Sequence, residues 1–206
     1  MELYFSPFAC SLAARVALYD AGHPATFVQV DNRAKRTERG EDFLAINPAG
    51  MVPVVRLDDG ELLTENSAIL AYLDTQMHPD RTPIERARLQ RWIGFINSEL
   101  HTGCFSAILD STAPPEVHAY SLERVKKRFA LLDAHLKGRD FLMDEFTVAD
   151  AYLAVVANWV QVRGPDLAAY PELSRYLAGL RARPGVARAM GEELQLYLEE
   201  QKRLAS

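Results

Sequence analysis

The sequence predicts an α/β domain followed by an all-helical domain. Over the first 76 residues, short apolar or β-branched segments alternate with segments of helical periodicity. Residues 77–83, "MHPDRTP", contain two prolines and indicate a linker. Beyond this linker only helical periodicity recurs. We therefore expect a first domain over residues 1–78 and a helical second domain over residues 84–206.

The first domain is predicted to follow the order β-α-β-α-β-β-α. Its first segment, "ELYF", is short and apolar, "ATFVQV" is β-branched, and Asp59-Gly60 is a tight-turn signal between two further strands. Residues 31–41 are polar and predict a loop. The predicted strands are residues 2–5, 25–30, 52–57 and 61–64, and the predicted helices are residues 10–21, 42–46 and 65–76.

The second domain is predicted to contain helices alone. Apolar residues recur three and four positions apart through most of it. Thr147 and Asp150 have the spacing of a capping box, which marks the start of a helix. The predicted helices are residues 83–109, 115–137, 147–163 and 172–182, with a last helix from about residue 185.

Composition and charge narrow the classes of function. The 206 residues are 49% apolar and carry a net charge of −5, which is typical of a globular chain and argues against general nucleic-acid binding. No apolar run reaches the ~18 residues that a membrane helix needs, and the first residues lack a signal-peptide pattern. The two cysteines, Cys10 and Cys104, do not form a disulfide framework. These features predict a cytoplasmic protein with no membrane or nucleic-acid partner.

Cys10 is the first candidate for chemistry. It lies in "SPFACSLAAR", where a strand gives way to a helix, and the N–H groups of a first helical turn favour a thiolate. Such a cysteine either acts as a nucleophile or holds the thiolate of a bound thiol, and a buried unreactive cysteine is the alternative. Ala13 stands where a dithiol oxidoreductase has its second cysteine, so a thiol partner must come from outside the chain.

Three further segments predict contacts with a ligand that resembles a peptide or an amino acid. Pro53 lies in an apolar segment and indicates either an edge strand or a cis Val52–Pro53 bond that leaves the Val52 backbone free to pair. Glu65 and Asn66 open a helix whose N–H groups can bind a carboxylate while Glu65 takes an ammonium; ordinary capping is the alternative. Lys35 belongs to a basic loop that is either solvated or reaches a second carboxylate.

The predicted helix over residues 83–109 carries a candidate acid–base residue. His101 shares one helical face with Asn97 and Cys104. A histidine at this place can polarise or deprotonate a group in a site, and a structural histidine is the alternative. Cys104 is expected to pack in the core.

Together these motifs resemble those of the cytosolic glutathione transferases, and within them the bacterial cysteine-type (beta) class. The resemblance covers essentially the whole chain and rests on the order and spacing of "YFSPFACSLAARVAL", "FLAINPAGMVPVVRLDDGELLTENSAILAYL", "SELH" and "FTVADAYL". It implies a thioredoxin-like first domain, a glutathione-transferase helical domain and a homodimer. It also implies glutathione as co-substrate and no metal.

The resemblance implies a role for each residue of the glutathione site. Cys10 matches the active-site cysteine beside the glutathione sulfur, and Val52, ahead of a cis Pro53, matches the residue whose backbone pairs with the cysteinyl part. The remaining matches are Glu65 and Asn66 for the γ-glutamyl end, Lys35 for the glycyl carboxylate, and Ser98, Glu99 and His101 for a helical segment that lines the site.

Three positions depart from the class, because Gly94 stands where asparagine is usual, Thr102 where lysine is common and Asn66 where glycine or serine is commoner. The linker over residues 77–83 is also several residues shorter than the class implies. The resemblance implies that the protein conjugates the glutathione thiolate to small, apolar electrophiles, a detoxification reaction. Two alternatives use the same residues. One is thiol–disulfide exchange (deglutathionylation) through Cys10, and the other is a binding or regulatory module that has the fold without catalysis.

Overall fold

The structure, a computed structural model, describes residues 1–205 and the side chains of residues 1–203. The chain forms two compact units, one of Met1–Pro79 together with the chain from Arg183 onward and the other of Asp80–Ala182. The sequence division placed everything from residue 84 on in the second domain. In the structure the last helix, α9 (Pro184–Ala205), instead packs against α1 (Leu12–Asp20) of the first unit.

The first unit is built on a five-stranded sheet in the order β3-β2-β1-β4-β5. β1 and β2 are parallel, and every other neighbouring pair is antiparallel. The strands are β1 (Glu2–Phe5), β2 (Thr26–Asp31), β3 (Arg36–Thr37), β4 (Val54–Arg56) and β5 (Leu62–Thr64). β3 falls in the segment predicted as a loop, because a strand of two residues shows no alternation of apolar and polar positions.

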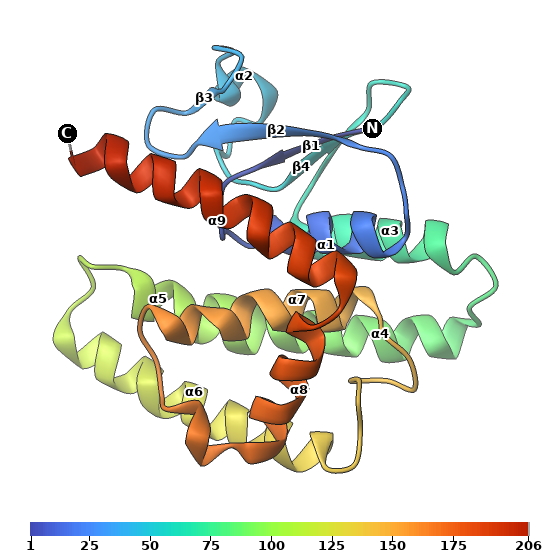
Figure 1. Ribbon diagram of the computed structural model, residues 1–206, viewed down its shortest axis with the longest axis vertical. Coiled ribbons are helices and arrows are strands. Elements are labelled where there is room, and N and C mark those ends of the chain that lie inside the picture. The colour runs from blue at the N-terminus through green and yellow to red at the C-terminus, as the bar shows by residue number, and fades with distance from the viewer. Residues whose placement is uncertain (206) are drawn as a thin grey trace. The chain divides into compact units, whose positions relative to one another are not determined.

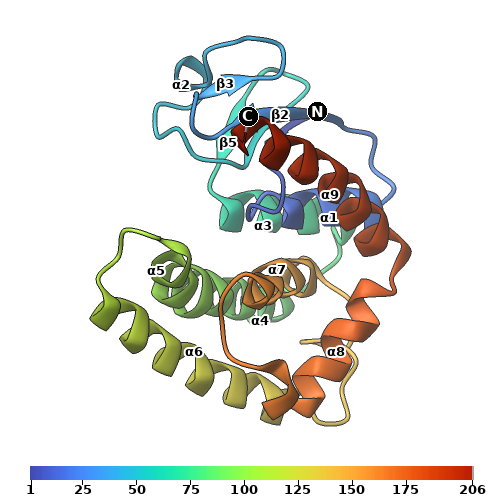
Figure 2. The ribbon, with the colours of Figure 1, turned by 60° about the vertical axis from the view of Figure 1, so that its left-hand side comes forward.

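Helices cover both faces of this sheet (Figures 1 and 2). α1 and α3 (Asn66–Met77) lie on one face and α2 (Phe43–Ile46) on the other, and α9 runs beside α1. α1 starts two residues later than predicted, because the residues before it form tight turns in which Phe8 has a φ of 56°. Cys10 therefore lies in the turn before the helix and not in its first turn.

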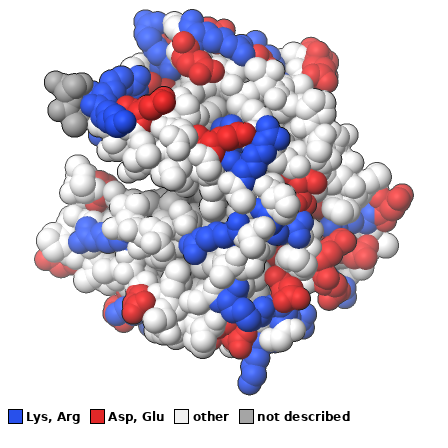
Figure 3. Space-filling model, in the orientation of Figure 1, with Lys and Arg blue, Asp and Glu red and all other residues white. Residues whose placement is uncertain are grey.

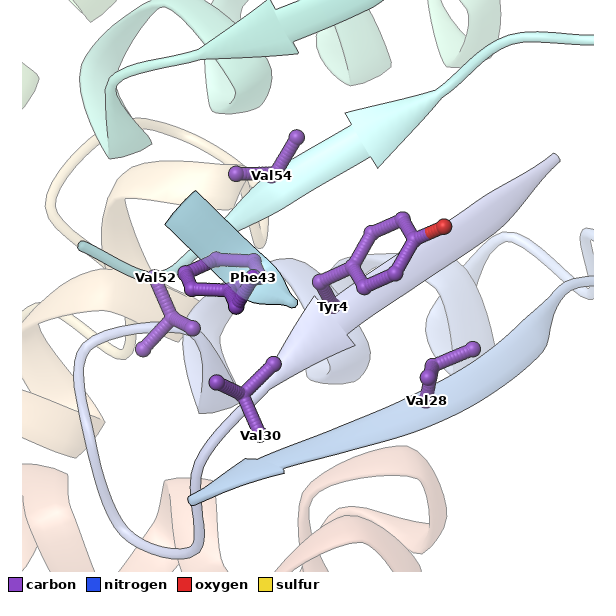
Figure 4. Packing of buried hydrophobic residues seen from close by; sticks show 6 residues of the cluster. All are labelled: Tyr4, Val28, Val30, Phe43, Val52 and Val54. Carbon is purple, nitrogen blue, oxygen red and sulfur yellow. The ribbon is translucent and has the colours of Figure 1, made fainter. Parts of the chain in front are cut away.

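A buried apolar cluster joins the sheet to α2 and fixes the segment that leads into β4 (Figure 4). The cluster consists of Tyr4, Val28, Val30, Phe43, Val52 and Val54. Phe43 of α2 packs on Tyr4 of β1, with the ring centroids 6.1 Å apart. Since Val52 belongs to this cluster, its backbone is held at a defined place at the end of the sheet.

The second unit is helical throughout, as predicted. Its helices are α4 (Pro83–Phe95), η1 (Ile96–Phe105, a π-helix), α5 (Ser106–Leu109), α6 (Pro115–Leu136), α7 (Val148–Asn158), the 3₁₀ turns η2 (Trp159–Gln161) and η3 (Leu167–Ala169), and α8 (Pro171–Arg181). α7 is buried from Val148 to Ala157, which makes it the central helix of this unit.

The start of α7 is the capping box predicted from Thr147 and Asp150. The buried Asp150 carboxylate accepts hydrogen bonds from the Thr147 N–H, the Leu142 N–H and the Tyr176 hydroxyl. Burial raises the pKa of Asp150, and these hydrogen bonds oppose that rise. The motif therefore serves folding, as the sequence indicated.

The predicted helix over residues 83–109 is continuous but changes its hydrogen-bond pattern at η1. A π-helix joins each N–H to the carbonyl five residues earlier. A Cβ at Gly103 would lie 2.4 Å from the Ser98 carbonyl oxygen, so only glycine fits there without a shift. The Thr102 hydroxyl donates to the Asn97 carbonyl at 2.6 Å, also five residues earlier. Apolar periodicity did not distinguish this wider turn from an α-helix.

In the part of the chain that the structure describes, none of the helices combines the length and apolar character needed to cross a bilayer. On the face shown in Figure 3, basic and acidic side chains are mixed. This face shows no extended patch of purely positive or purely negative charge.

Candidate functional site

Two of the predicted motifs meet in the first unit, where the Cys10 thiol donates a hydrogen bond to the Val52 carbonyl over 3.5 Å. The Val52–Pro53 peptide bond is cis. Pro53 lies directly before β4, which pairs with β1 on one side and β5 on the other, so it is not an edge-strand proline. The structure thus favours the second of the two readings of Pro53.

The environment of Cys10 differs from the one the sequence predicted. Burial raises the pKa of the Cys10 thiol to about 12, while hydrogen bonds from the backbone of Cys10 and Ser11 oppose the rise only in part. The negative charge of Glu65 raises it further. Of the two expected roles of the helix start, an anionic Cys10 sulfur is therefore wrong, because removal from water outweighs the backbone N–H groups, and the stabilisation of a bound thiolate stays a prediction. Cys10 is a neutral thiol at physiological pH.

The turn that carries Cys10 is held by the last helix. The Glu193 carboxylate of α9 is fully buried and accepts a hydrogen bond from the Phe8 N–H at 2.8 Å. Burial raises the pKa of Glu193 to about 8. Arg15 of α1 is also buried; its guanidinium lies 3.6 Å from the Glu193 carboxylate and also pairs with Glu192.

Sequence reasoning missed Glu193, although a signal for it was present. In α9 the buried residues Val186 and Ala189 precede it by seven and four positions, so Glu193 continues the buried face of an amphipathic helix. A carboxylate at a core position needs a buried partner, and here the partners are the Phe8 N–H and Arg15.

The segment before Val52 is held by two side chains. The Lys35 ammonium donates to the Gly50 carbonyl at 2.7 Å, and the Asn47 amide donates to the Met51 carbonyl at 2.8 Å. Gly50 has a φ of 64°, in the left-handed region that favours glycine. Lys35, the residue predicted near a glycyl carboxylate, thus lies beside the strand segment predicted to pair with a peptide.

Glu65 and Asn66 stand at the start of α3, as predicted, but they do not cap it. Glu65 is exposed, has a φ of 68°, and makes no side-chain capping hydrogen bond. Asn66 is buried, and among the described residues neither its amide nitrogen nor its amide oxygen has a hydrogen-bond partner. A buried amide without partners is costly unless a ligand satisfies it. The capping alternative is thus excluded. The amide nitrogen and oxygen of Asn66 are candidates for hydrogen bonds with a ligand.

In the second unit, His101 is bound to the buried Tyr152 of α7. Its Nδ1 lies 2.7 Å from the Tyr152 hydroxyl, which also donates to the Asn97 Oδ1 at 3.1 Å. The His101 ring lies edge-on to the Trp159 ring, 4.9 Å away. Burial lowers the pKa of His101, so its ring is neutral at physiological pH.

The other predicted residues of this segment have partners inside the unit. The Ser98 hydroxyl is exposed and donates to the Gly94 carbonyl at 2.8 Å. The Glu99 carboxylate accepts from the Arg128 guanidinium of α6 at 2.7 Å, and this bond lowers the pKa of Glu99. Cys104 is fully buried, as expected of a packing residue.

Two family models match the chain, the glutathione S-transferase N-terminal domain over residues 5–76 and the glutathione S-transferase C-terminal domain over residues 95–184. The chain belongs to the glutathione S-transferase family. A curated relative in this family, glutathione S-transferase GstA of Escherichia coli O157:H7, is 34% identical over 199 residues, which cover 94% of this chain and 98% of that protein.

Solved glutathione S-transferases have the same fold. A sphingomonad glutathione S-transferase complexed with glutathione is 41% identical, with a TM-score of 0.89 over 94% of this chain and 98% of that one. The bacterial beta class transferase of Sphingomonas chungbukensis is 38% identical, with a TM-score of 0.88 over the same shares of the two chains. The transferase family, the beta-class resemblance and the thioredoxin-like and helical domains expected from the sequence are therefore confirmed.

Proposed function

We propose that this transferase conjugates the thiolate of glutathione to small, apolar electrophiles. The observation that carries the proposal is Asn66, a buried amide with no partner, at the start of α3 in the same unit as Cys10 and the Val52–Pro53 segment. Glutathione offers hydrogen-bond partners for these residues. Its amino-acid end suits Glu65 and Asn66, and its peptide link suits the backbone of Val52.

The residues of the first unit fit glutathione as follows. The γ-glutamyl carboxylate would accept from the Asn66 amide and the N–H groups that open α3, and its ammonium would meet Glu65. The backbone of Val52 would pair with the cysteinyl part, and Lys35 would face the glycyl carboxylate. This assignment gives the unsatisfied Asn66 amide nitrogen an acceptor.

The neutral Cys10 thiol suits conjugation. At present it donates to the Val52 carbonyl, and the same S–H can donate to a glutathione thiolate and stabilise its charge. In substitution of an aryl halide, the glutathione sulfur forms the C–S bond, the halide leaves with the bonding electrons, and the thiol proton passes to a base. We propose His101 for that base, because its ring is neutral at physiological pH.

The raised pKa of Cys10 weighs against the alternative of thiol–disulfide exchange. That reaction needs a Cys10 thiolate to attack a disulfide sulfur, and a pKa of about 12 leaves very little thiolate at neutral pH. Any exchange needs the Cys10 sulfur itself as the nucleophile, whereas conjugation uses the sulfur of glutathione, so we expect Cys10→Ala to reduce conjugation less than it reduces disulfide exchange. Rates measured for an aryl halide and for a glutathione mixed disulfide test this division, and an equal loss in both would refute it.

Glutathione binding and conjugation, measured together, distinguish an enzyme from a module that has the fold without catalysis. Calorimetric titration of the protein with glutathione is expected to show one site per chain, and the bound protein is expected to conjugate an aryl halide. A protein that binds no glutathione would overturn the proposal. A protein that binds glutathione but conjugates none of a panel of aryl halides and epoxides would leave a binding or regulatory module.

We also propose that the protein is a cytoplasmic homodimer. The support for a dimer is an apolar stripe on α6, where Val117, Tyr120 and Leu131 are exposed and fall on one helical face. Beside Leu131 the surface is hollowed by a cavity of about 250 Å³ lined also by Trp92 and Phe95. Exposed apolar patches of this kind are typical of protein–protein contacts.

A further inference from the structure

His101, Tyr152 and Asn97 form a chain of hydrogen bonds inside the second unit. The Tyr152 hydroxyl is buried and lies 2.7 Å from His101 Nδ1 and 3.1 Å from Asn97 Oδ1. Asn97 and His101 come from the same turn of η1, and Tyr152 comes from the central helix α7. Both distances are those of normal hydrogen bonds, and the role of His101 Nδ1 in its bond depends on the tautomer of the ring.

Counting protons assigns these roles. A tyrosine hydroxyl has one proton to donate, and an amide oxygen can only accept. Since the Tyr152 proton is donated to Asn97 Oδ1, the Tyr152 oxygen acts as an acceptor toward His101. The donor at that contact is His101 Nδ1, which must then carry the proton of the neutral ring.

We propose that Asn97 and Tyr152 are positioning residues that hold His101 in its Nδ1–H tautomer and leave Nε2 as the bare, basic nitrogen. The proposal rests on the role of His101 proposed above, and it adds which atom of the ring takes the proton. Trp159 supports the arrangement, because its ring packs edge-on against the imidazole and limits rotation that would exchange the two sides of the ring. Among the described residues, Nε2 has no hydrogen-bond partner that would use its lone pair.

Asn97 and His101 can share one hydroxyl because side chains four residues apart lie on one face of a helix. Both belong to the π-helical turn η1, in which Gly103 allows a close approach to the Ser98 carbonyl.

The tautomer can be observed directly by nuclear magnetic resonance. Protein labelled with ¹⁵N-histidine gives long-range ¹H–¹⁵N correlations in which protonated and bare ring nitrogens have well-separated shifts. The chain has 5 histidines, and His101 is assigned as the set of signals lost in His101→Gln. At neutral pH we expect a protonated Nδ1 and a bare Nε2. A wild-type His101 with the proton on Nε2 would overturn the proposal.

Substitutions at Asn97 test the proton count. In Asn97→Ala the Tyr152 proton loses its acceptor and becomes free to bond His101 Nδ1, so we expect the ring to switch to the Nε2–H tautomer. Asn97→Asp keeps an acceptor oxygen and is expected to keep the wild-type tautomer. Ser106→Ala is the matched control, because it removes a 3.1 Å bond to the His101 carbonyl without touching the ring. An unchanged tautomer in Asn97→Ala would contradict the proposal.

Kinetic measurements test the tautomer of His101 and its proposed catalytic role independently of each other. We expect Asn97→Ala to lower kcat for conjugation about tenfold or more, with KM for glutathione unchanged, and Asn97→Asp to restore kcat. If the tautomers follow the expected pattern but His101→Gln retains full kcat, the inference about the ring is supported and the catalytic role of His101 is wrong. If conjugation depends on His101 but the ring carries its proton on Nε2, the transferase function stands and the inference fails.

Discussion

Two buried polar side chains of the first unit, Asn66 and Glu193, differ in their partners. Asn66 has no hydrogen-bond partner among the described residues, and such a group lowers stability and gains when a ligand supplies a partner. One oxygen of Glu193 accepts from the Phe8 N–H, while the other has no hydrogen bond and lies 3.6 Å from the Arg15 guanidinium. Ligand binding therefore tests Asn66, and the pH dependence of stability tests Glu193.

Replacing Asn66 with an apolar residue should separate folding from binding. We expect Asn66→Leu to leave the free energy of unfolding unchanged or to raise it, because a buried unsatisfied amide is removed. Glutathione affinity should fall by about 1.5–3 kcal/mol, the range for hydrogen bonds to a charged group. Urea denaturation and calorimetric titration measure the two quantities.

The matched control is Asn47→Leu. Asn47 is also buried, but its amide bonds the Met51 carbonyl and accepts from the Ala49 N–H, so this substitution should destabilise the protein. A loss of stability in Asn66→Leu as large as that in Asn47→Leu would show that Asn66 is satisfied by the protein itself.

Glu193 predicts a dependence of stability on pH. Its pKa in the folded protein is about 8, above the ordinary value of 4.5, so the folded state holds a proton that the unfolded state has lost between these two values. The free energy of unfolding should therefore fall as pH rises from about 4.5 to about 8. We expect Glu193→Gln to flatten this fall, measured by urea denaturation across the range. Glu199→Gln, an exposed glutamate on the same helix, should keep the wild-type slope.

The sequence was informative about residues wherever a local motif identifies the role. Pro53 was identified because a proline inside an apolar strand segment has few structural roles. The capping box was identified from the three-residue spacing of Thr147 and Asp150. The pKa of Cys10 was predicted in the wrong direction, since burial depends on residues far away in the chain, which no local pattern reports. Glu193 was missed for the same reason, because its partners lie more than 170 positions away.

At the scale of elements, η1 is the feature that departs from a regular fold. The helix from Pro83 to Leu109 contains ten π-helical residues, and His101, which contacts Tyr152, is one of them. The helices and most strands were predicted within a few residues because their periodicity is long or their boundaries carry proline and glycine. The π-helix was not, because it changes the hydrogen-bond pattern without changing which residues are apolar.

Two glycines of this helix test whether the π-helix depends on Gly103. In Gly103→Ala the new Cβ would lie 2.4 Å from the Ser98 carbonyl oxygen, so we expect a loss of about 1–3 kcal/mol in the free energy of unfolding. In Gly94→Ala the Cβ would meet no atom within 4 Å, and we expect a gain of roughly 0.5–1 kcal/mol, since alanine favours helix. Urea denaturation measures both, and two effects of equal sign would contradict this assignment.

At the scale of the whole molecule, the α6 stripe of Val117, Tyr120 and Leu131 bears on assembly. We expect the wild-type protein to elute with the mass of a dimer in size-exclusion chromatography with light scattering. Leu131→Glu should shift it toward the monomer, because a charge would be buried in the apolar contact. Val162→Glu replaces an exposed apolar residue outside α6 and should remain dimeric. A monomeric wild type, or a Leu131→Glu variant that stays dimeric, would contradict the proposed contact.

The return of α9 to the first unit has a consequence for synthesis. During translation the sheet and the Cys10 turn leave the ribosome long before Glu193, the residue that binds the Phe8 N–H. The turn that carries Cys10 therefore lacks its hydrogen bond to Glu193 until nearly the entire polypeptide has been made. A pulse of a thiol-alkylating reagent applied to ribosome-bound chains should label Cys10 faster than it labels the released protein.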